Sequence, residues 1–110
     1  MTISTHVLDT SIGRPAVAVD VRLLAREADG AWREIGHGTT GADGRVAGLG
    51  PPTGVGEYCL RFDVGSYFRA RGTESFYSVV NVEFHTADQS AHYHVPLLVS
   101  PYGYSTYRGS

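Results

Sequence analysis

The sequence contains no lysine, only one cysteine and no long apolar run. All nine basic residues are arginines, and eleven acidic residues bring the formal net charge to -2. That balance excludes the strongly basic surface of a typical nucleic-acid-binding domain. The lone Cys59 excludes an intrachain disulfide and a cysteine-based zinc cluster. A membrane span needs about 20 consecutive apolar residues, and the sequence has no such run. We therefore expect no membrane partner, and the net charge leads us to expect no nucleic-acid partner either.

The length and composition indicate one domain, residues 1–110. Apolar residues make up 42% of the 110 residues, which is enough for a core and too many for a disordered chain. The opening MTISTHVLDT lacks the basic and apolar regions of a secretory signal, and the final residues are not a peroxisomal SKL. A cytoplasmic location is therefore the expectation.

Short alternating segments predict an all-β protein. Apolar residues recur with period two in most of them, as in half-buried strands. Glycine-rich turns are expected at 29–30 and 41–44, a loop at 48–56, and one helix over 65–72 that ends at a glycine. The pattern predicts an antiparallel two-sheet β-sandwich with one short helix. The expected strands span residues 17–23, 31–35, 57–62, 76–86, 92–99 and 102–108.

The strand predicted over 92–99 has one face that is neither apolar nor simply solvated. Its core face consists of Tyr93, Val95, Leu97 and Val99. The opposite face carries His92, His94, Pro96 and Leu98, a mixture that suits a subunit interface or the wall of a cavity. Proline cannot donate to a strand ladder, so we expect pairing to be interrupted or edge-like at Pro96.

Taken from the residues alone, His92 and His94 leave three possibilities open. They can be surface or interface residues, an acid or base, or two metal ligands completed by His6, His37 or His85. No HExxH or cysteine motif supports the metal site. No GxSxG motif surrounds Ser105 or Ser110, and no phosphate-binding loop is present. Arg45, which follows a turn, would by itself be an ordinary solvated residue.

Five segments together resemble a known family. They are THVLDTSIGRPA (5–16), ADGR (42–45), DVGSYFRARG (63–72), FYSVVNVEF (76–84) and HYHVPLLVSPYGYSTYRGS (92–110). Over nearly its whole length the chain resembles the 5-hydroxyisourate hydrolase branch of the transthyretin-like proteins. The final YRGS is typical of the hydrolases, and the hormone-carrying transthyretins lack it.

The resemblance implies a fold, an assembly and a reaction. Family members are β-sandwiches with one short helix that assemble as homotetramers, dimers of dimers, with active sites where two dimers meet. They need no metal or organic cofactor. Their reaction opens the cyclic amide ring of 5-hydroxyisourate to 2-oxo-4-hydroxy-4-carboxy-5-ureidoimidazoline in urate catabolism.

The resemblance also implies which residues form the site. His94 would be the general base on water, while Arg45 and Arg108 would bind carbonyl groups and developing negative charge. His92 matches no catalytic position. The implied catalytic residues are His6, Arg45 and His94, and the implied substrate-binding residues are Tyr107, Arg108, Gly109 and Ser110.

Two other classes of protein are compatible with a sandwich of this size. One is a transthyretin-like carrier that binds a small aromatic ligand without turnover. The other is a monomeric structural or adhesive module, in which His92, His94 and Tyr107 would be exposed and unimportant. The polar group of histidines and arginine argues against a site built only for an apolar ligand.

Overall fold

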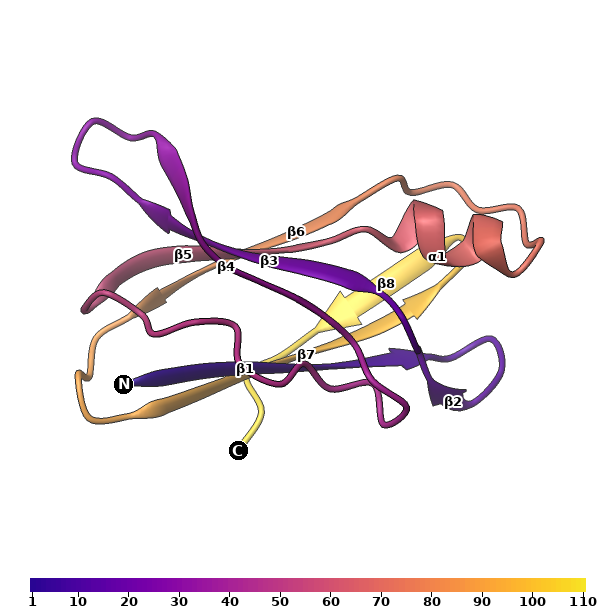
Figure 1. Ribbon diagram of the computed structural model, residues 1–110, viewed down its shortest axis with the longest axis horizontal. Helices are drawn as coiled ribbons and strands as arrows, with labels where there is room; N and C mark the ends of the chain where they lie inside the picture. The colour runs from indigo at the N-terminus through magenta and orange to yellow at the C-terminus, as the bar shows by residue number, and fades with distance from the viewer.

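The computed structural model describes residues 1–110 and shows two four-stranded sheets packed face to face (Figure 1). The first sheet has the order β2-β1-β7-β8, and the second has the order β4-β3-β5-β6. The single helix, α1, lies at one end of the sandwich, and both termini lie toward the other (Figure 1). The predicted all-β, two-sheet class is therefore confirmed. The elements are β1 (Thr2–Asp9), β2 (Arg14–Pro15), β3 (Asp20–Arg26), β4 (Trp32–Thr39), β5 (Gly56–Phe62), α1 (Val64–Ala70), β6 (Val80–Thr86), β7 (His92–Ser100) and β8 (Gly103–Thr106).

The core lies between the two sheets and is made of the strand residues that the alternation predicted to face inward. These side chains are almost fully buried, as expected where one face of each sheet packs on the other. They include Val19, Val21, Leu23, Tyr58, Leu60, Phe62, Tyr93, Val95, Leu97 and Val99. Period-two alternation was a sound guide here because burial acts on one face only.

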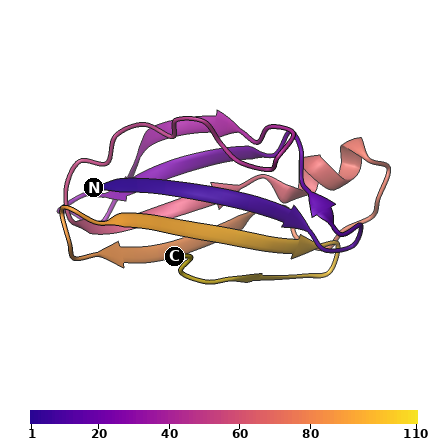
Figure 2. The same cartoon turned by 90° about the horizontal axis from the view of Figure 1, so that it is seen from below.

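The first strand, β1, was not predicted. Its inward positions alternate between apolar Ile3 and Val7 and polar Thr5 and Asp9, and all four are buried. The two polar residues hide the period-two pattern. The strand pairs with β7 in parallel, in a register that runs from Thr2↔His92 to Asp9↔Val99. Figure 2 shows the two strands side by side and running in the same direction. This parallel pair is one departure from the antiparallel arrangement of the other strands.

Two predicted strands begin later than expected. Val17 and Phe76 are 48% and 73% exposed and lie outside the strands. Ala18 adopts a positive φ of 65°, which turns the chain just before β3 begins at Asp20. The backbone N–H of Phe76 donates to Pro101 O (2.8 Å) instead of joining a ladder. Phe76 is therefore bonded to the β7–β8 turn, and β6 begins only at Val80.

The helix occurs where the sequence predicts one, with slightly earlier boundaries. It begins after Asp63, whose carboxylate accepts a hydrogen bond from the Ser66 N–H, the usual N-terminal cap. Beyond its end, Gly72 adopts a φ of +67°. The Tyr67 hydroxyl donates to the buried Asp9 carboxylate (2.7 Å) and ties the helix to β1. Burial, with this bond to Asp9, raises the pKa of Tyr67 to about 12.

The structure contains no helix with the length and apolar character of a membrane span.

The C-terminal segment leaves its sheet where Pro96 ends the ladder. Strand β8 pairs with β7 only from Ser100↔Gly103 to Leu97↔Thr106, so the predicted strand over 102–108 is wrong beyond Thr106. The predicted interruption at Pro96 is confirmed on this side. On its other side, however, β7 pairs with β1 straight through Pro96, and β7 is a central strand, not an edge. The tail returns at Gly109, whose N–H donates to His94 O (2.7 Å).

Candidate active site

The outward faces of β1 and β7 bring the N-terminal and C-terminal motifs together. Ser4 lies opposite His94, and His6 lies opposite Pro96. His6 and His94 are therefore diagonal neighbours on one face. Both are half-buried. The parallel register thus joins two histidines that are far apart in the sequence.

The turn over residues 41–45 adds Arg45 to this pair. The N–H of Val7 donates to Gly44 O (2.9 Å), and His6 and Arg45 form an isolated antiparallel bridge. Gly44 has a φ of +78°, and a Cβ atom there would lie 2.4 Å from Val7 O. Only glycine meets both demands, conformation and close approach. The turn can therefore lie against β1 and present the exposed Arg45 side chain beside His6.

One ring nitrogen of His6 is already engaged. Its Nε2 lies 2.7 Å from Asp43 O. A carbonyl oxygen only accepts, so Nε2 carries the proton and Nδ1 is left as the other nitrogen. This bond holds the imidazole against the 41–45 turn and leaves His6 better suited to orient Arg45 and substrate than to activate water through Nε2.

His94 has the opposite arrangement, with one ring nitrogen free. Its Nδ1 lies 2.8 Å from Ser4 Oγ, while Nε2 makes no hydrogen bond to the protein. Burial holds the pKa of His94 below its ordinary value, with smaller contributions from the charges of Arg45, His92 and His6. The imidazole is therefore neutral at neutral pH. A neutral imidazole with a free nitrogen is what a general base requires.

Gly109 packs directly on His94 from the returning tail. A Cβ atom at Gly109 would lie 2.5 Å from His94 Cδ2 and 3.3 Å from Pro96 Cγ. Any side chain here would have to displace the imidazole. Of the predicted tail residues, Gly109 is thus part of the His94 environment, and the exposed Ser110 follows it directly.

Tyr107 and Arg108 lie beside a neighbouring groove. The Arg108 guanidinium stacks on the ring of Tyr93, 4.6 Å from its centroid, and Tyr93 belongs to the inward face of β7. The groove has a volume of about 480 Å³ and also contains Phe84 and His85 of β6. Within one protomer, the structure therefore brings together His6, Arg45, His94 and Gly109, and places Tyr107 and Arg108 on the adjoining edge.

Two further residues contact His94 or its neighbours: Ser4, which the sequence analysis did not consider, and His92, which it set aside as matching no catalytic position. Ser4 Oγ lies 2.9 Å from His92 Nε2 and 2.8 Å from His94 Nδ1. The available signal was parity, because Ser4 lies two residues before His6 and hence on the same face of a strand. Since β1 was not predicted, that signal went unused.

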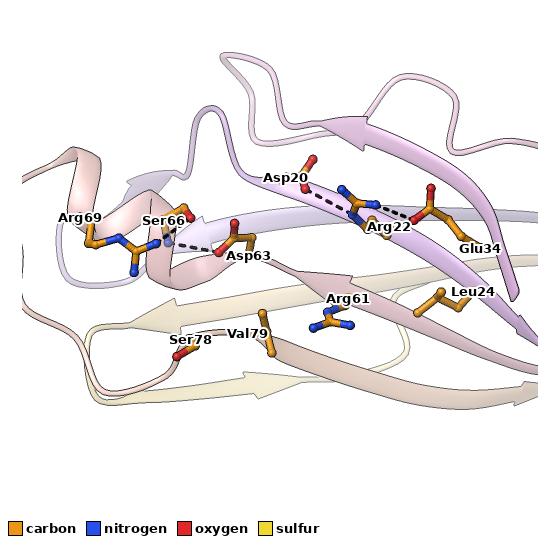
Figure 3. A pocket seen from close by; sticks show the side chains of 10 residues that line it. All are labelled: Asp20, Arg22, Leu24, Glu34, Arg61, Asp63, Ser66, Arg69, Ser78 and Val79. Carbon is orange, nitrogen blue, oxygen red and sulfur yellow. Dashed lines mark hydrogen bonds and ion pairs between the residues drawn. The ribbon is translucent and has the colours of Figure 1, made fainter. Parts of the chain in front are cut away.

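A second groove, on the outer face of the second sheet, contains none of the predicted site residues (Figure 3). It has a volume of about 460 Å³. Its charged side chains largely satisfy one another: Arg22 pairs with Glu34 at 2.7 Å and with Asp20 at 3.5 Å, and Asp63 caps α1. No histidine or cysteine lines this groove.

The histidines do not gather into a metal centre. His37 pairs with Asp20 on the second sheet, whereas His94 lies on the first. No group of three or more histidine, cysteine, aspartate or glutamate side chains is placed to hold a metal ion. The side chains around His94 offer imidazole, hydroxyl and guanidinium groups.

Comparison with known protein families identifies the family of this chain. The model of the HIUase/Transthyretin family matches residues 3–109. The chain belongs to the HIUase/transthyretin family. A curated relative, the 5-hydroxyisourate hydrolase 2 of Rhizobium meliloti, is 47% identical over 98% of this chain and 95% of its own length.

Solved structures of both branches of the family share the fold. The 5-hydroxyisourate hydrolase of Klebsiella pneumoniae matches with a TM-score of 0.85 at 39% identity, covering 99% of this chain and 93% of that one. Sea bream transthyretin in complex with thyroxine matches with a TM-score of 0.93 at 30% identity, covering 99% and 95%. Backbone similarity therefore does not separate the branches, whereas identity favours the hydrolases. The predicted resemblance is confirmed.

Proposed function

We propose that this chain is a 5-hydroxyisourate hydrolase, which opens the cyclic amide ring of its substrate in urate catabolism. The observation that carries the proposal is the free Nε2 of His94, a histidine whose pKa burial lowers, on the same face as His6 and the Arg45 turn. The hydrolase relatives support it through identities of 43–47% over 98% of the chain.

Hydrolysis of an amide needs an activated water and a proton for the leaving nitrogen. His94 Nε2 takes a proton from water as the oxygen bonds to the ring carbonyl carbon. The carbon–nitrogen bond then breaks, and the same proton passes from Nε2 to the departing nitrogen. The imidazole ends the cycle neutral. Such base catalysis contributes roughly 10²–10⁴-fold to the rate.

The developing oxyanion needs a positive partner. Arg45, beside His6 on the turn, offers a planar guanidinium that can bind it, or a substrate carbonyl, through two N–H groups. His6 keeps the turn and Arg45 in place through its bond to Asp43 O. By resemblance to the family, Arg108, Tyr107, Gly109 and Ser110 complete the substrate site. No metal or organic cofactor takes part in this scheme.

We also propose a homotetramer, a dimer of dimers, with sites where the two dimers meet. The site lies on an outer sheet face and is open: Arg45 is exposed, and Tyr107 is 59% exposed. The outer strands β6 and β8 are free edges in the protomer. A second dimer over the first sheet would cover the site and exclude water from it, which strengthens electrostatic contacts.

A coupled assay tests the function. Urate oxidase converts urate to 5-hydroxyisourate, and its decay is followed with and without this protein. Acceleration over spontaneous decay at sub-stoichiometric protein supports the hydrolase. The proposal is contradicted if each protein chain removes no more than one molecule of 5-hydroxyisourate. It is also contradicted if folded protein does not accelerate the decay at all.

The carrier remains the second candidate because the sea bream transthyretin complexed with thyroxine has the same fold. It predicts stoichiometric binding of a small aromatic ligand without turnover. Titration with thyroxine in the same preparation separates the two candidates. Turnover of 5-hydroxyisourate without thyroxine binding excludes the carrier.

A further inference from the structure

A continuous row of hydrogen bonds links four polar side chains on the outer face of β1 and β7. Thr2 Oγ1 bonds to His92 Nδ1, His92 Nε2 lies 2.9 Å from Ser4 Oγ, and Ser4 Oγ lies 2.8 Å from His94 Nδ1. The register Thr2↔His92 and Ser4↔His94 places each hydroxyl opposite an imidazole. The two rings are nearly parallel, with centroids 6.4 Å apart and an interplanar angle of 14°.

We propose that Ser4, backed by His92, is a positioning residue that holds His94 in the tautomer with its proton on Nδ1 and a lone pair on Nε2. The inference rests on the proposed hydrolase function and goes beyond it, because it gives a role to two residues outside the expected site.

The protons of the row can run in two directions, and one of them gives this tautomer. A serine hydroxyl has one proton to donate and can accept at its lone pairs. When His94 Nδ1–H donates to Ser4 Oγ, the serine proton is free to reach His92 Nε2, and His92 Nδ1–H reaches Thr2. Every group in the row is then paired, and Nε2 of His94 keeps its lone pair. The reverse direction pairs the same groups but places a proton on Nε2, which could then not take a proton from water, so the proposed base function selects the first direction.

The same bond serves the protonated state. When Nε2 takes the proton from water, the Nδ1–H of the resulting imidazolium still donates to Ser4 Oγ, now as a stronger charge-assisted bond. The charged or titratable groups that face His94 are Arg45 from the turn, His6 from β1 and His92 from β7. All of them disfavour the imidazolium when they are positive. The acceptor that stabilises its Nδ1–H is the neutral oxygen of Ser4.

An isosteric pair of variants tests the role of the hydroxyl. Ser4→Thr keeps it, and Ser4→Val has the same shape as threonine without it. We expect Ser4→Val to lower kcat by roughly 10- to 100-fold, by analogy with the range seen where an outer partner orients a metal-bound imidazole. We expect Ser4→Thr to stay near the wild type. Thr39→Val, at an exposed strand position on the second sheet, is the control for losing a strand hydroxyl.

Nitrogen-15 NMR of labelled protein measures the tautomer without any turnover. The wild type should show His94 protonated at Nδ1, and Ser4→Val should shift the population toward Nε2–H. The acid limb of kcat/KM should also move to lower pH in Ser4→Val, because the imidazolium loses its acceptor. His92→Phe, which keeps a ring but removes the acceptor for the serine proton, should show a smaller shift in the same direction.

The outcomes separate this role from packing and from the proposed function. A wild-type His94 protonated at Nε2, or an equal loss of kcat in Ser4→Thr and Ser4→Val, overturns the proposal. If Ser4→Val does not fold, Ser4→Ala and His92→Phe carry the same NMR comparison. If the wild type does not turn over 5-hydroxyisourate, the proposed function fails, while the tautomer measurement still decides the role of Ser4.

Discussion

At the scale of single residues, the two site histidines differ in which ring nitrogen is occupied. His6 uses Nε2 on a backbone carbonyl, whereas His94 uses Nδ1 on a serine and leaves Nε2 free. The family resemblance predicts both as site residues, with His94 as the base. The hydrogen-bond partners agree with the proposed division, in which His94 is the base and His6 orients the turn that carries Arg45.

Replacing His94 by alanine should lower kcat by about 10²–10⁴-fold, the usual contribution of a general base. The backbone bonds of His94 to Gly109 and β1 do not involve its side chain, so the fold should persist. The measurement is steady-state decay of 5-hydroxyisourate, with circular dichroism to verify folding. His37→Ala, on the second sheet, is the control. Near-normal turnover by His94→Ala would remove the base assignment.

The pH dependence of kcat/KM should report the depressed pKa of His94. Burial and the neighbouring positive charges lower this pKa from the ordinary histidine value of 6.5. The base must be neutral, so activity should persist below pH 6.5 and fall only at more acidic pH. The unfolded chain binds more protons in that window, so acidification through it also lowers stability. An acid limb above pH 6.5 would contradict the environment described for His94.

At the scale of elements, the site depends on where strands start, stop and pair. The parallel β1–β7 register aligns the two motifs, and Pro96 ends the β7–β8 ladder so that the tail can leave. The tail then reattaches through Gly109 over the His94 ring. A proline and a glycine two and fifteen residues from His94 thus shape the surroundings of its imidazole.

Gly109→Ala should displace the His94 ring and lower kcat while leaving the sandwich folded. A new Cβ atom would lie 2.5 Å from His94 Cδ2, and a misplacement of about 1 Å can cost on the order of 10²-fold in rate. Gly103→Ala is the matched control, because its Cβ would meet only Ser100 Oγ at 3.7 Å. Equal kcat values for the two variants would show that the ring tolerates the extra methyl group.

The contact between α1 and β1 should be a measurable source of stability. Tyr67→Phe removes the hydroxyl that donates to Asp9, which is 1% exposed. A buried acceptor that loses a partner costs about 1–3 kcal/mol. Urea unfolding at a fixed protein concentration measures the free energy of unfolding, with Tyr77→Phe as the control at a tyrosine whose hydroxyl makes no hydrogen bond. The Asp9 carboxylate also accepts hydrogen bonds from the backbone N–H and the hydroxyl of Ser11. Equal stabilities would mean that these two bonds alone satisfy Asp9.

At the scale of the whole molecule, the first sheet has one face in the core and its other face only half covered. Ser4, His6, His94 and Leu98 are all half-buried on that outer face. The protomer alone leaves the site open to water on one side. The proposed dimer of dimers would close it, so catalysis and assembly should depend on the same surface.

Size-exclusion chromatography with light scattering should find a mass close to four times the 11.8 kDa chain. Leu98→Arg, which places a charge on the outer face that also carries His94, should yield smaller species and a loss of kcat together. Val55→Arg, in the exposed 47–55 loop, is the control and should change neither. A monomeric wild type with full activity would exclude the tetramer as a requirement.

Local patterns in the sequence were enough to predict the layers of the sandwich, and the motifs were enough to name candidate site residues. Alternation placed Val21, Leu60 and Leu97 in the core because hydrophobic burial acts on one face of a strand at a time. Glycine marked the turns because only glycine adopts their backbone angles at no cost. The motifs named His6, Arg45 and His94 through their family resemblance.

The pairing of strands and of the side chains on them became visible only in the folded structure. The buried polar residues Thr5 and Asp9 hid β1 from any pattern of hydrophobicity, because their burial is made tolerable by partners elsewhere in the fold. The register with β7, and with it the Ser4–His94 bond, joins positions 90 residues apart. Long-range pairing of this kind depends on which edges are free once the core has formed, and no local segment of the chain encodes it.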